Sequence, residues 1–99
     1  MAAELEDRPE AQDDIEAAAL WYEVQRTGLG ERFVSEVDVL IDRIRSHPLQ
    51  FPPIEPPVRR ALLHRFPYAL YFVSEDEGGG VVLAVLHQHR NPDAWRDRL

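Results

Sequence analysis

The chain has 99 residues, 44% of them hydrophobic, which suits one domain with a single core and is too little for two. It has no cysteine, which excludes disulfide bonds, thiolate metal sites and a cysteine nucleophile and fits a reducing cytoplasm. All 11 basic residues are arginine, so a lysine base is excluded, and the net charge of -7 argues against a protein that coats nucleic acid.

The charge is distributed unevenly along the chain. Residues 1–57 carry 13 acidic and 5 basic side chains. Residues 58–99 carry 5 acidic and 6 basic side chains, together with three of the four histidines. We therefore expect any anionic partner to meet the C-terminal half.

The stretch from Ala2 to Asp7 is acidic, and Leu5 is its only large apolar residue. Such a composition is poor for a strand, and we expect no more than an edge strand there. No basic region leads into an apolar run at this end, and the apolar runs elsewhere are short. We therefore expect neither a signal peptide nor a membrane span, and a cytoplasmic location.

Two amphipathic helices are predicted next, over about residues 9–26 and 31–46. Pro9 suits a first helical turn, and the first helix has an apolar stripe at helical spacing, formed by Ala11, Ile15, Ala18, Ala19 and Tyr22. We expect Leu20, Trp21 and Val24 to widen this buried face. The second helix repeats the pattern at Phe33, Val37, Leu40, Ile41 and Ile44. Because Gly28 and Gly30 interrupt the pattern, the two helices should form an antiparallel hairpin.

The second half predicts a sheet. Five prolines between residues 48 and 57 favour an extended connector without regular structure. Strands are expected from Val58 to about Phe66, over residues 68–73 and, after a turn at 74–80, over residues 81–86, the last one buried on both faces. Asn91 and Pro92 resemble a helix cap and first position, so a short helix is expected at 93–99. The predicted order is β-α-α-β-β-β-α, an α+β fold in one domain, residues 1–99.

Four segments in register resemble the ParE branch of the ParE/RelE superfamily, the toxin halves of bacterial type II toxin–antitoxin pairs. They are Arg8-Pro9-Glu10-Ala11 leading into Ala18-Ala19-Leu20-Trp21-Tyr22; Gly28-Leu29-Gly30-Glu31-Arg32-Phe33; Arg59-Arg60-Ala61-Leu62-Leu63-His64-Arg65-Phe66-Pro67-Tyr68; and Val85-Leu86-His87-Gln88-His89-Arg90-Asn91-Pro92-Asp93-Ala94-Trp95. The resemblance implies a helix hairpin packed on a twisted, mainly antiparallel four-stranded sheet, with a short C-terminal helix.

The resemblance also implies a function. ParE-like plasmid stabilisation toxins are associated with inhibition of DNA gyrase and are held inactive by a cognate antitoxin encoded beside them. RelE-like members are instead ribosome-dependent mRNA endoribonucleases. A third possibility is a non-toxic interaction module of the same fold. A homodimer and a hetero-oligomer with the antitoxin both remain open, and no cofactor is implied.

The candidate functional residues gather near the last predicted strand. For target binding we single out Arg59, Arg65, His87, His89, Arg90 and Trp95. If the chain is a nuclease, His89 is the candidate general acid or base, with Arg90 and Arg65 holding phosphate.

The nuclease pattern of the family is incomplete in this sequence. RNA-cleaving members place lysine and arginine along the sheet and a tyrosine on the final helix. This chain has no lysine, and it has His89 at the arginine position and Trp95 at the tyrosine position. An indole N–H only donates, so the sequence favours a binding protein over an enzyme.

Two other interpretations of these residues are a zinc site and a purely structural role for Trp95. His87 and His89 with His64 could ligate zinc, but the missing cysteine and the lack of a nearby carboxylate disfavour this, and we expect no metal. Trp95 is more typical of a residue that anchors the last helix to the sheet than of a base-stacking platform.

Overall fold

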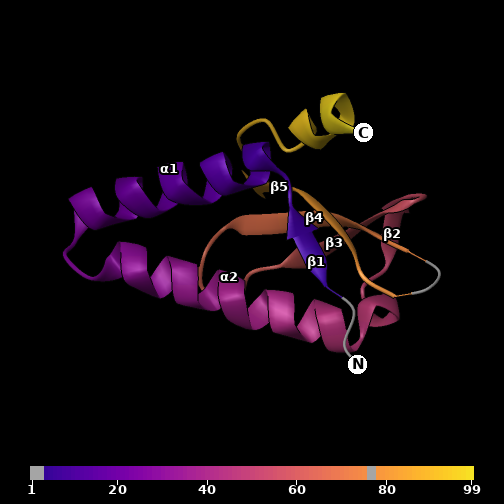
Figure 1. Ribbon diagram of the computed structural model, residues 1–99. Coiled ribbons are helices and arrows are strands. Elements are labelled where there is room, and N and C mark those ends of the chain that lie inside the picture. The colour runs from indigo at the N-terminus through magenta and orange to yellow at the C-terminus, as the bar shows by residue number, and fades with distance from the viewer. Residues whose placement is uncertain (1–3, 76–77) are drawn as a thin grey trace.

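The computed structural model describes residues 4–75 and 78–99. These residues form a helix pair, a sheet and a short C-terminal segment (Figure 1). In chain order the elements are β1 (Leu5–Asp7), α1 (Pro9–Gln25), α2 (Leu29–Ser46), the 3-10 turn η1 (Pro48–Gln50), β2 (Pro53–Glu55), β3 (Val58–Leu62), β4 (Tyr68–Ser74), β5 (Gly80–His87) and the 3-10 helix η2 (Ala94–Arg98). Within them, no helix is long and apolar enough to cross a membrane.

The sheet has five strands in the order β1-β5-β4-β3-β2. β1 pairs with β5 in parallel, and the other neighbours are antiparallel, which confirms the mainly antiparallel prediction. The predicted count of four strands was wrong, because the proline-rich connector contributes β2 at one edge. An edge strand tolerates proline, since one side of its backbone needs no N–H donor. The expected N-terminal edge strand is present as β1, while Ala2 and Ala3 lie outside the described residues.

The two helices lie side by side as the predicted antiparallel hairpin (Figure 1). Gly28 has a φ of 90°, a left-handed conformation that glycine adopts at little cost, and it joins the helices. At Gly30 the helices come so close that a Cβ would lie 2.4 Å from the carbonyl oxygen of Ala19. These two glycines therefore serve different purposes, one in the turn and one in the helix contact.

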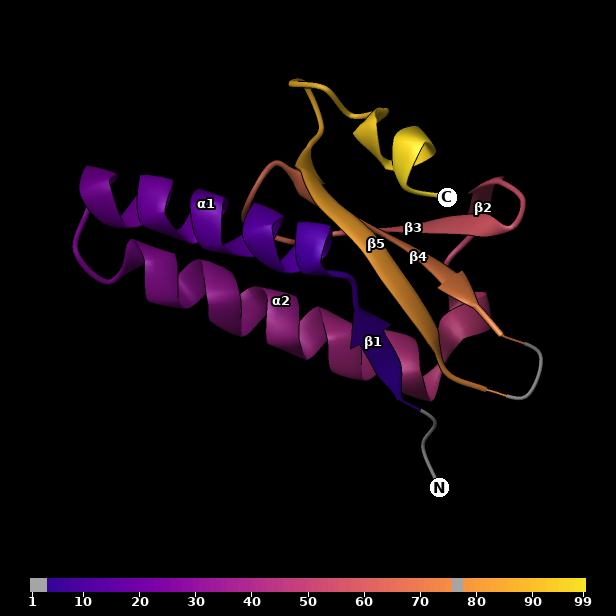
Figure 2. The ribbon, with the colours of Figure 1, turned by 45° about the horizontal axis from the view of Figure 1, so that its top comes forward.

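The sheet separates two apolar layers (Figure 2). On one face the hairpin covers a core that includes Phe33, Ile44, Leu70 and Phe72. On the other face η2 covers a smaller core built around Tyr71, Leu83 and Trp95. β5 is buried on both faces over most of its length, as its continuous apolar sequence predicted.

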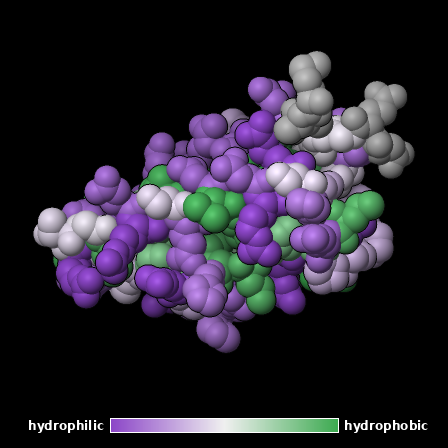
Figure 3. Space-filling model, turned by 90° about the horizontal axis from the view of Figure 1, so that it is seen from below, coloured by the Kyte–Doolittle hydropathy of each residue, from purple (hydrophilic) through white to green (hydrophobic). Residues whose placement is uncertain are grey.

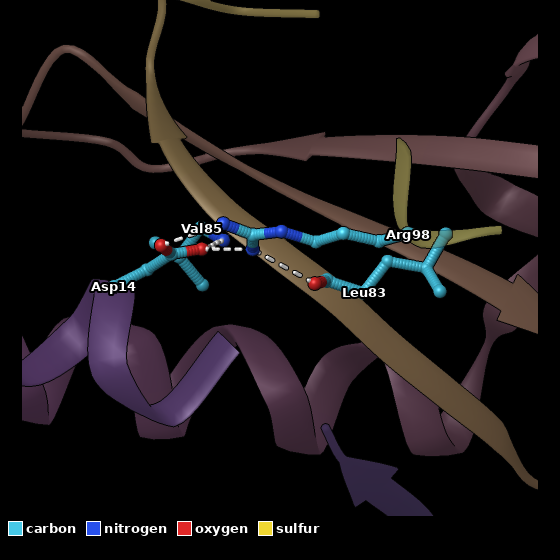
Figure 4. A network of polar contacts seen from close by, with 4 residues as sticks. All are labelled: Asp14, Leu83, Val85 and Arg98. Carbon is cyan, nitrogen blue, oxygen red and sulfur yellow. Dashed lines mark hydrogen bonds and ion pairs between the residues drawn. The ribbon is translucent and has the colours of Figure 1, made fainter. Parts of the chain in front are cut away.

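A network of polar contacts ties the C-terminal segment to α1 (Figure 4). The guanidinium of Arg98 donates to both carboxylate oxygens of Asp14, at 2.6 and 3.1 Å, and to the carbonyl of Leu83 at 3.1 Å. Asp14 also accepts the backbone N–H of Val85 at 3.0 Å. Two side chains thus pair with the edge of β5 beyond the end of β1.

The predicted start of the last helix was wrong. Asn91 does not cap a helix; it lies in a turn with a φ of 54°, and its carbonyl accepts the N–H of Ala94. Asparagine tolerates this left-handed conformation better than most residues. The chain therefore turns once more before the helical segment begins at Ala94, and that segment is a 3-10 helix.

Two further predictions need correction. The strand expected from Val58 to Phe66 ends at Leu62, because residues 63–67 turn back into β4. Leu20, Trp21 and Val24 are not part of a buried face, being 67%, 48% and 76% exposed. The reason is visible in Figures 1 and 2, where the tip of the hairpin extends past the sheet, so that this part of α1 has no strand to cover its outer side.

Candidate functional site

The structure divides the six predicted binding residues among separate places. His87 ends β5, and His89 and Arg90 follow it in a turn. The other three lie elsewhere: Arg65 in the turn between β3 and β4, Arg59 in β3, and Trp95 in η2. The first three are brought together, and the others have distinct surroundings.

His87 sits against Tyr68 and His89. Its ring meets Tyr68 edge to face at 5.2 Å between centroids, and the ring of His89 lies 5.8 Å away. The backbone N–H of His89 donates to Nδ1 of His87 at 3.0 Å. Desolvation, followed by the charges of Arg90 and His89, lowers the pKa of His87 below its ordinary value. The imidazole is therefore neutral near pH 7, with Nδ1 already occupied as an acceptor and the proton on Nε2.

Arg90 lies over an exposed aromatic side chain of the hairpin. Its guanidinium carbon is 5.9 Å from the centroid of the Trp21 ring, within the range of a cation–π contact. Burial raises the pKa of the Tyr22 and Tyr68 phenols, and the positive charge of Arg90 partly offsets this. We call the group His87, His89, Arg90, Tyr68 and Trp21 the strand-end cluster.

Arg65 belongs to a neighbouring surface. Its backbone N–H and that of His64 both donate to Oε1 of Glu36, at 2.8 and 2.9 Å, which holds the β3–β4 turn against α2. The Arg65 side chain lines an open groove of about 930 Å³ between this turn, the end of α1 and the first half of α2. We call this the hairpin groove.

Sequence reasoning missed Arg26 and Arg32, which also line the hairpin groove. Both belong to the N-terminal half, in which acidic residues outnumber basic ones, so the charge distribution gave no reason to single them out. The sequence nevertheless indicates that they are close in space, because they lie on either side of Thr27-Gly28, where the helical pattern is interrupted. A predicted helix hairpin already brings such residues to the same tip.

Arg59 and Trp95 are engaged inside the fold. Arg59 donates from Nη1 to the carbonyl of Phe51 at 2.7 Å, which fixes the proline-rich connector to β3. Trp95 is 2% exposed and stacks on Tyr71 at 6.0 Å, and the guanidinium carbon of Arg96 lies 4.5 Å from the centroid of its ring. Trp95 therefore has the anchoring position that its size led us to expect. Its contact with a target stays a prediction and requires η2 to leave the sheet.

The zinc alternative finds no support in the described residues. Across residues 4–75 and 78–99, no three histidine or carboxylate side chains come together in a way that could hold a metal ion. His64 lies in the turn that Glu36 holds, so it does not complete a set with His87 and His89.

Comparisons with known proteins agree with this architecture. One solved structure, described as the chromosomal ParDE TA system from P. aeruginosa, matches with a TM-score of 0.74 and 19% sequence identity, over 87% of this chain and 96% of the other. At that identity the likeness shows the fold. No curated protein matches. The model of one protein family, described as ParE toxin of type II toxin-antitoxin system, parDE, matches residues 5–92. The chain therefore belongs to the ParE toxin family of type II toxin–antitoxin systems.

Proposed function

We propose that the protein is a toxin that acts by binding an essential cytoplasmic target, with DNA gyrase as the favoured target, and that a cognate antitoxin neutralises it. Family membership supports the toxin role. The residue at the position where RNA-cleaving relatives carry a tyrosine supports binding over catalysis: it is Trp95, whose indole only donates and which is stacked in a core. The observation that carries the proposal is the burial of Trp95 at this position, because the last helix then offers no side chain there that could transfer a proton to RNA.

One observation keeps ribonuclease action as the second candidate. His89 and Arg90 are both exposed and adjacent, and Arg65 is exposed as well. A histidine beside arginines is a minimal arrangement for moving a proton near a phosphate. Such an enzyme would depend sharply on His89, whereas a binder would lose affinity gradually across its surface.

The first experiment separates these functions. The protein is induced in bacteria, and growth, plasmid supercoiling and mRNA integrity are followed together. We expect growth arrest with altered supercoiling and intact mRNA, and inhibition of DNA supercoiling by purified gyrase when the protein is added. Arrest with cleaved mRNA would replace the proposal with ribonuclease action. Soluble, folded protein without arrest would leave a non-toxic interaction module.

Two single-residue variants test whether the protein acts by binding or by catalysis. We expect His89→Gln to reduce the effect on gyrase less than tenfold, because most interface side chains cost less than about 1 kcal/mol when they are removed. Arg45→Gln is the matched control, since Arg45 lies on α2 and pairs with Asp42, away from the strand-end cluster. A complete loss of activity in His89→Gln, with Arg45→Gln unaffected, would point to catalysis.

For the antitoxin we propose the outer side of α1. Ala17, Leu20, Trp21 and Val24 are exposed and follow the spacing i, i+3, i+4, i+7 of one helix face. We call this the outer stripe. An amphipathic helix recognises such a row through its own apolar face, so the outer stripe is suited to a helical antitoxin segment.

A further inference from the structure

Three of the protein's arginines, Arg26, Arg32 and Arg65, line the hairpin groove. Its three arginines come from three different parts of the chain, namely the end of α1, the first half of α2 and the β3–β4 turn. All three are exposed. In the part of the chain that the structure describes, Arg26, Arg32 and Arg65 form no ion pair within 4.0 Å. Three arginines that form no ion pair among the described residues therefore line one groove in a chain of net charge -7.

Carboxylates are present as well: Glu31 and Glu36 line the groove, and Glu23 lies beside it. Glu23 accepts the backbone N–H groups of Gly28 and Gly30 at 3.0 and 3.1 Å, which places it on the N-terminus of α2. Glu36 accepts the N–H groups of the β3–β4 turn. Glu31 remains as the acidic side chain that lines the groove without such a bond. A hydrogen-bonded carboxylate keeps its charge, so the lining residues set three arginines against two glutamates, a small positive surplus in a chain that is acidic as a whole.

Apart from Ser35 and Gly28, the rest of the lining is formed by apolar and aromatic side chains. Tyr22 and Phe66 pack edge to face at 4.7 Å, and Leu29 and Pro67 border them. Val39 adds an apolar side chain that is 60% exposed. Figure 3, which views the molecule from the α2 side, shows hydrophobic side chains set among hydrophilic ones on this face. A ligand of the groove therefore needs an apolar group as well as negative charge.

These features favour an acidic peptide over a nucleic acid. Nucleic acid binding relies on many phosphate contacts along a cationic surface, whereas only three arginines are gathered here and the chain as a whole is acidic. The rings of Tyr22 and Phe66 pack on each other, so they do not present free faces for base stacking. Guanidinium groups pair well with carboxylates, through two parallel hydrogen bonds.

We infer that the hairpin groove binds an acidic peptide segment of a partner protein, with carboxylates on Arg26, Arg32 and Arg65 and an apolar side chain against Leu29 and Val39. The inference depends neither on gyrase as the target nor on the outer stripe. A second copy of this chain is a poor occupant, because two molecules of charge -7 repel each other.

The test uses the purified protein and a short fluorescein-labelled peptide in which Glu and Asp flank a central Leu-Phe pair. Fluorescence anisotropy is measured at low salt and at physiological ionic strength. Two control peptides replace either the acidic residues with Lys or the Leu-Phe pair with Ser-Ser. We expect only the acidic, apolar peptide to bind, with an affinity that falls as salt rises. No binding of this peptide at about 1 mM overturns the inference.

Protein variants then locate the site. Arg26→Gln, Arg32→Gln and Arg65→Gln should each weaken binding about fivefold, and the triple variant about 100-fold if the effects add. Arg45→Gln, on α2 but outside the groove lining, is the control and should bind as the original protein does. Undiminished binding by the triple variant would assign the peptide to another surface.

A second measurement does not depend on variants. Backbone NMR shifts in the original protein should change at residues 28–32 and 65–67 when the peptide is added, and a single-stranded oligonucleotide should not reproduce the change. Stronger binding of the oligonucleotide, or shifts confined to other residues, contradicts the inference. Because this assay contains neither antitoxin nor gyrase, its failure would leave the proposed toxin function standing.

Discussion

Several acidic side chains in this protein serve its own backbone. Asp14 accepts an N–H of β5, Glu23 accepts two at the start of α2, and Glu36 accepts two in the β3–β4 turn. Each connects segments that are distant in the sequence or closes a turn. In the sequence all three resemble ordinary surface charges. The backbone N–H groups that donate to them show that each also stabilises the fold.

Asp14 allows a direct test of this role. Asp14→Ala removes the bonds to Val85 and to the guanidinium of Arg98 from a pair that is mostly buried, with side-chain exposures of 15% and 19%. We expect the free energy of unfolding to fall by about 2–3 kcal/mol in urea denaturation, since hydrogen bonds to charged groups are strong and Arg98 loses its partner.

The control for Asp14 is its exposed neighbour. Asp13→Ala should change the free energy of unfolding by less than about 0.5 kcal/mol, as is usual for surface positions. If both variants lose the same amount, the loss comes from the N-terminal charge of α1 and not from the network with Arg98.

His87 gives the protein a predictable response to pH. Its pKa is lower in the folded protein than the ordinary value of 6.5. Just below pH 6.5, the imidazole is therefore protonated more often in the unfolded chain than in the folded protein. The free energy of unfolding should therefore be highest above pH 6.5 and decrease as the pH falls toward the folded-state pKa. Protonation of Nδ1 also breaks its bond from the His89 N–H.

The measurement compares the original protein with His87→Asn, in urea denaturation on either side of pH 6.5. Asparagine keeps an acceptor near Nδ1 but does not titrate, so the decrease at acidic pH should be smaller. Asp7 acts in the opposite direction at lower pH, because burial and then Asp38 raise its pKa. An unchanged pH profile in His87→Asn would assign the dependence to other groups.

At the scale of elements, the helix hairpin and the three central strands were predictable, because each carries a periodic pattern or a continuous apolar run. β2 was missed, since its prolines argue against a strand and only its position at the edge makes it possible. The end of β3 and the start of η2 were misplaced because tertiary contacts decide them. Glu36 holds the turn after β3, and Trp95 fixes η2 on the sheet.

The two glycines of the hairpin predict different responses to alanine. Gly30→Ala should lower the free energy of unfolding by about 2–3 kcal/mol, because the new methyl group overlaps the carbonyl of Ala19 and the helices must separate. Gly28→Ala should cost only about 1 kcal/mol, since the space beside it is open and the penalty is that of its positive φ. Urea denaturation of both variants measures the difference. A stabilised Gly30→Ala, as helix propensity alone would predict, would mean that the helices are farther apart than described.

At the scale of the whole molecule, sequence patterns placed the candidate site only in part. His87, His89 and Arg90 were predicted together from their position on the last strand and its exit, and the rings of His87 and His89 do lie 5.8 Å apart, while their role in binding stays a prediction. Arg26 and Arg32 were not assigned to any surface and Trp21 was assigned to the buried face, because helical periodicity cannot tell where the sheet ends. The molecule is 40 Å long, and the hairpin tip extends beyond the strands (Figure 2). Residues near this tip are therefore exposed, although their helical spacing predicts a buried face.

The exposed tip leads to a prediction that separates neutralisation from toxicity. Leu20→Ser with Val24→Ser removes two large apolar side chains from the outer stripe, which are 67% and 76% exposed. If a helical antitoxin segment buries both, the affinity for the cognate antitoxin should fall at least about 100-fold, since each buried anchor contributes about 1.5–3 kcal/mol. Leu49→Ser is the matched control, an equally exposed leucine in η1.

In cells, the double variant should arrest growth even when the antitoxin is present, whereas Leu49→Ser should remain neutralised. Affinity is measured by titration calorimetry with the purified antitoxin, and folding is checked by circular dichroism. Retained neutralisation of the double variant would move the antitoxin to another surface. Loss of arrest without antitoxin would instead show that the outer stripe contacts the target, because a side chain that serves only neutralisation leaves toxicity intact when it is removed.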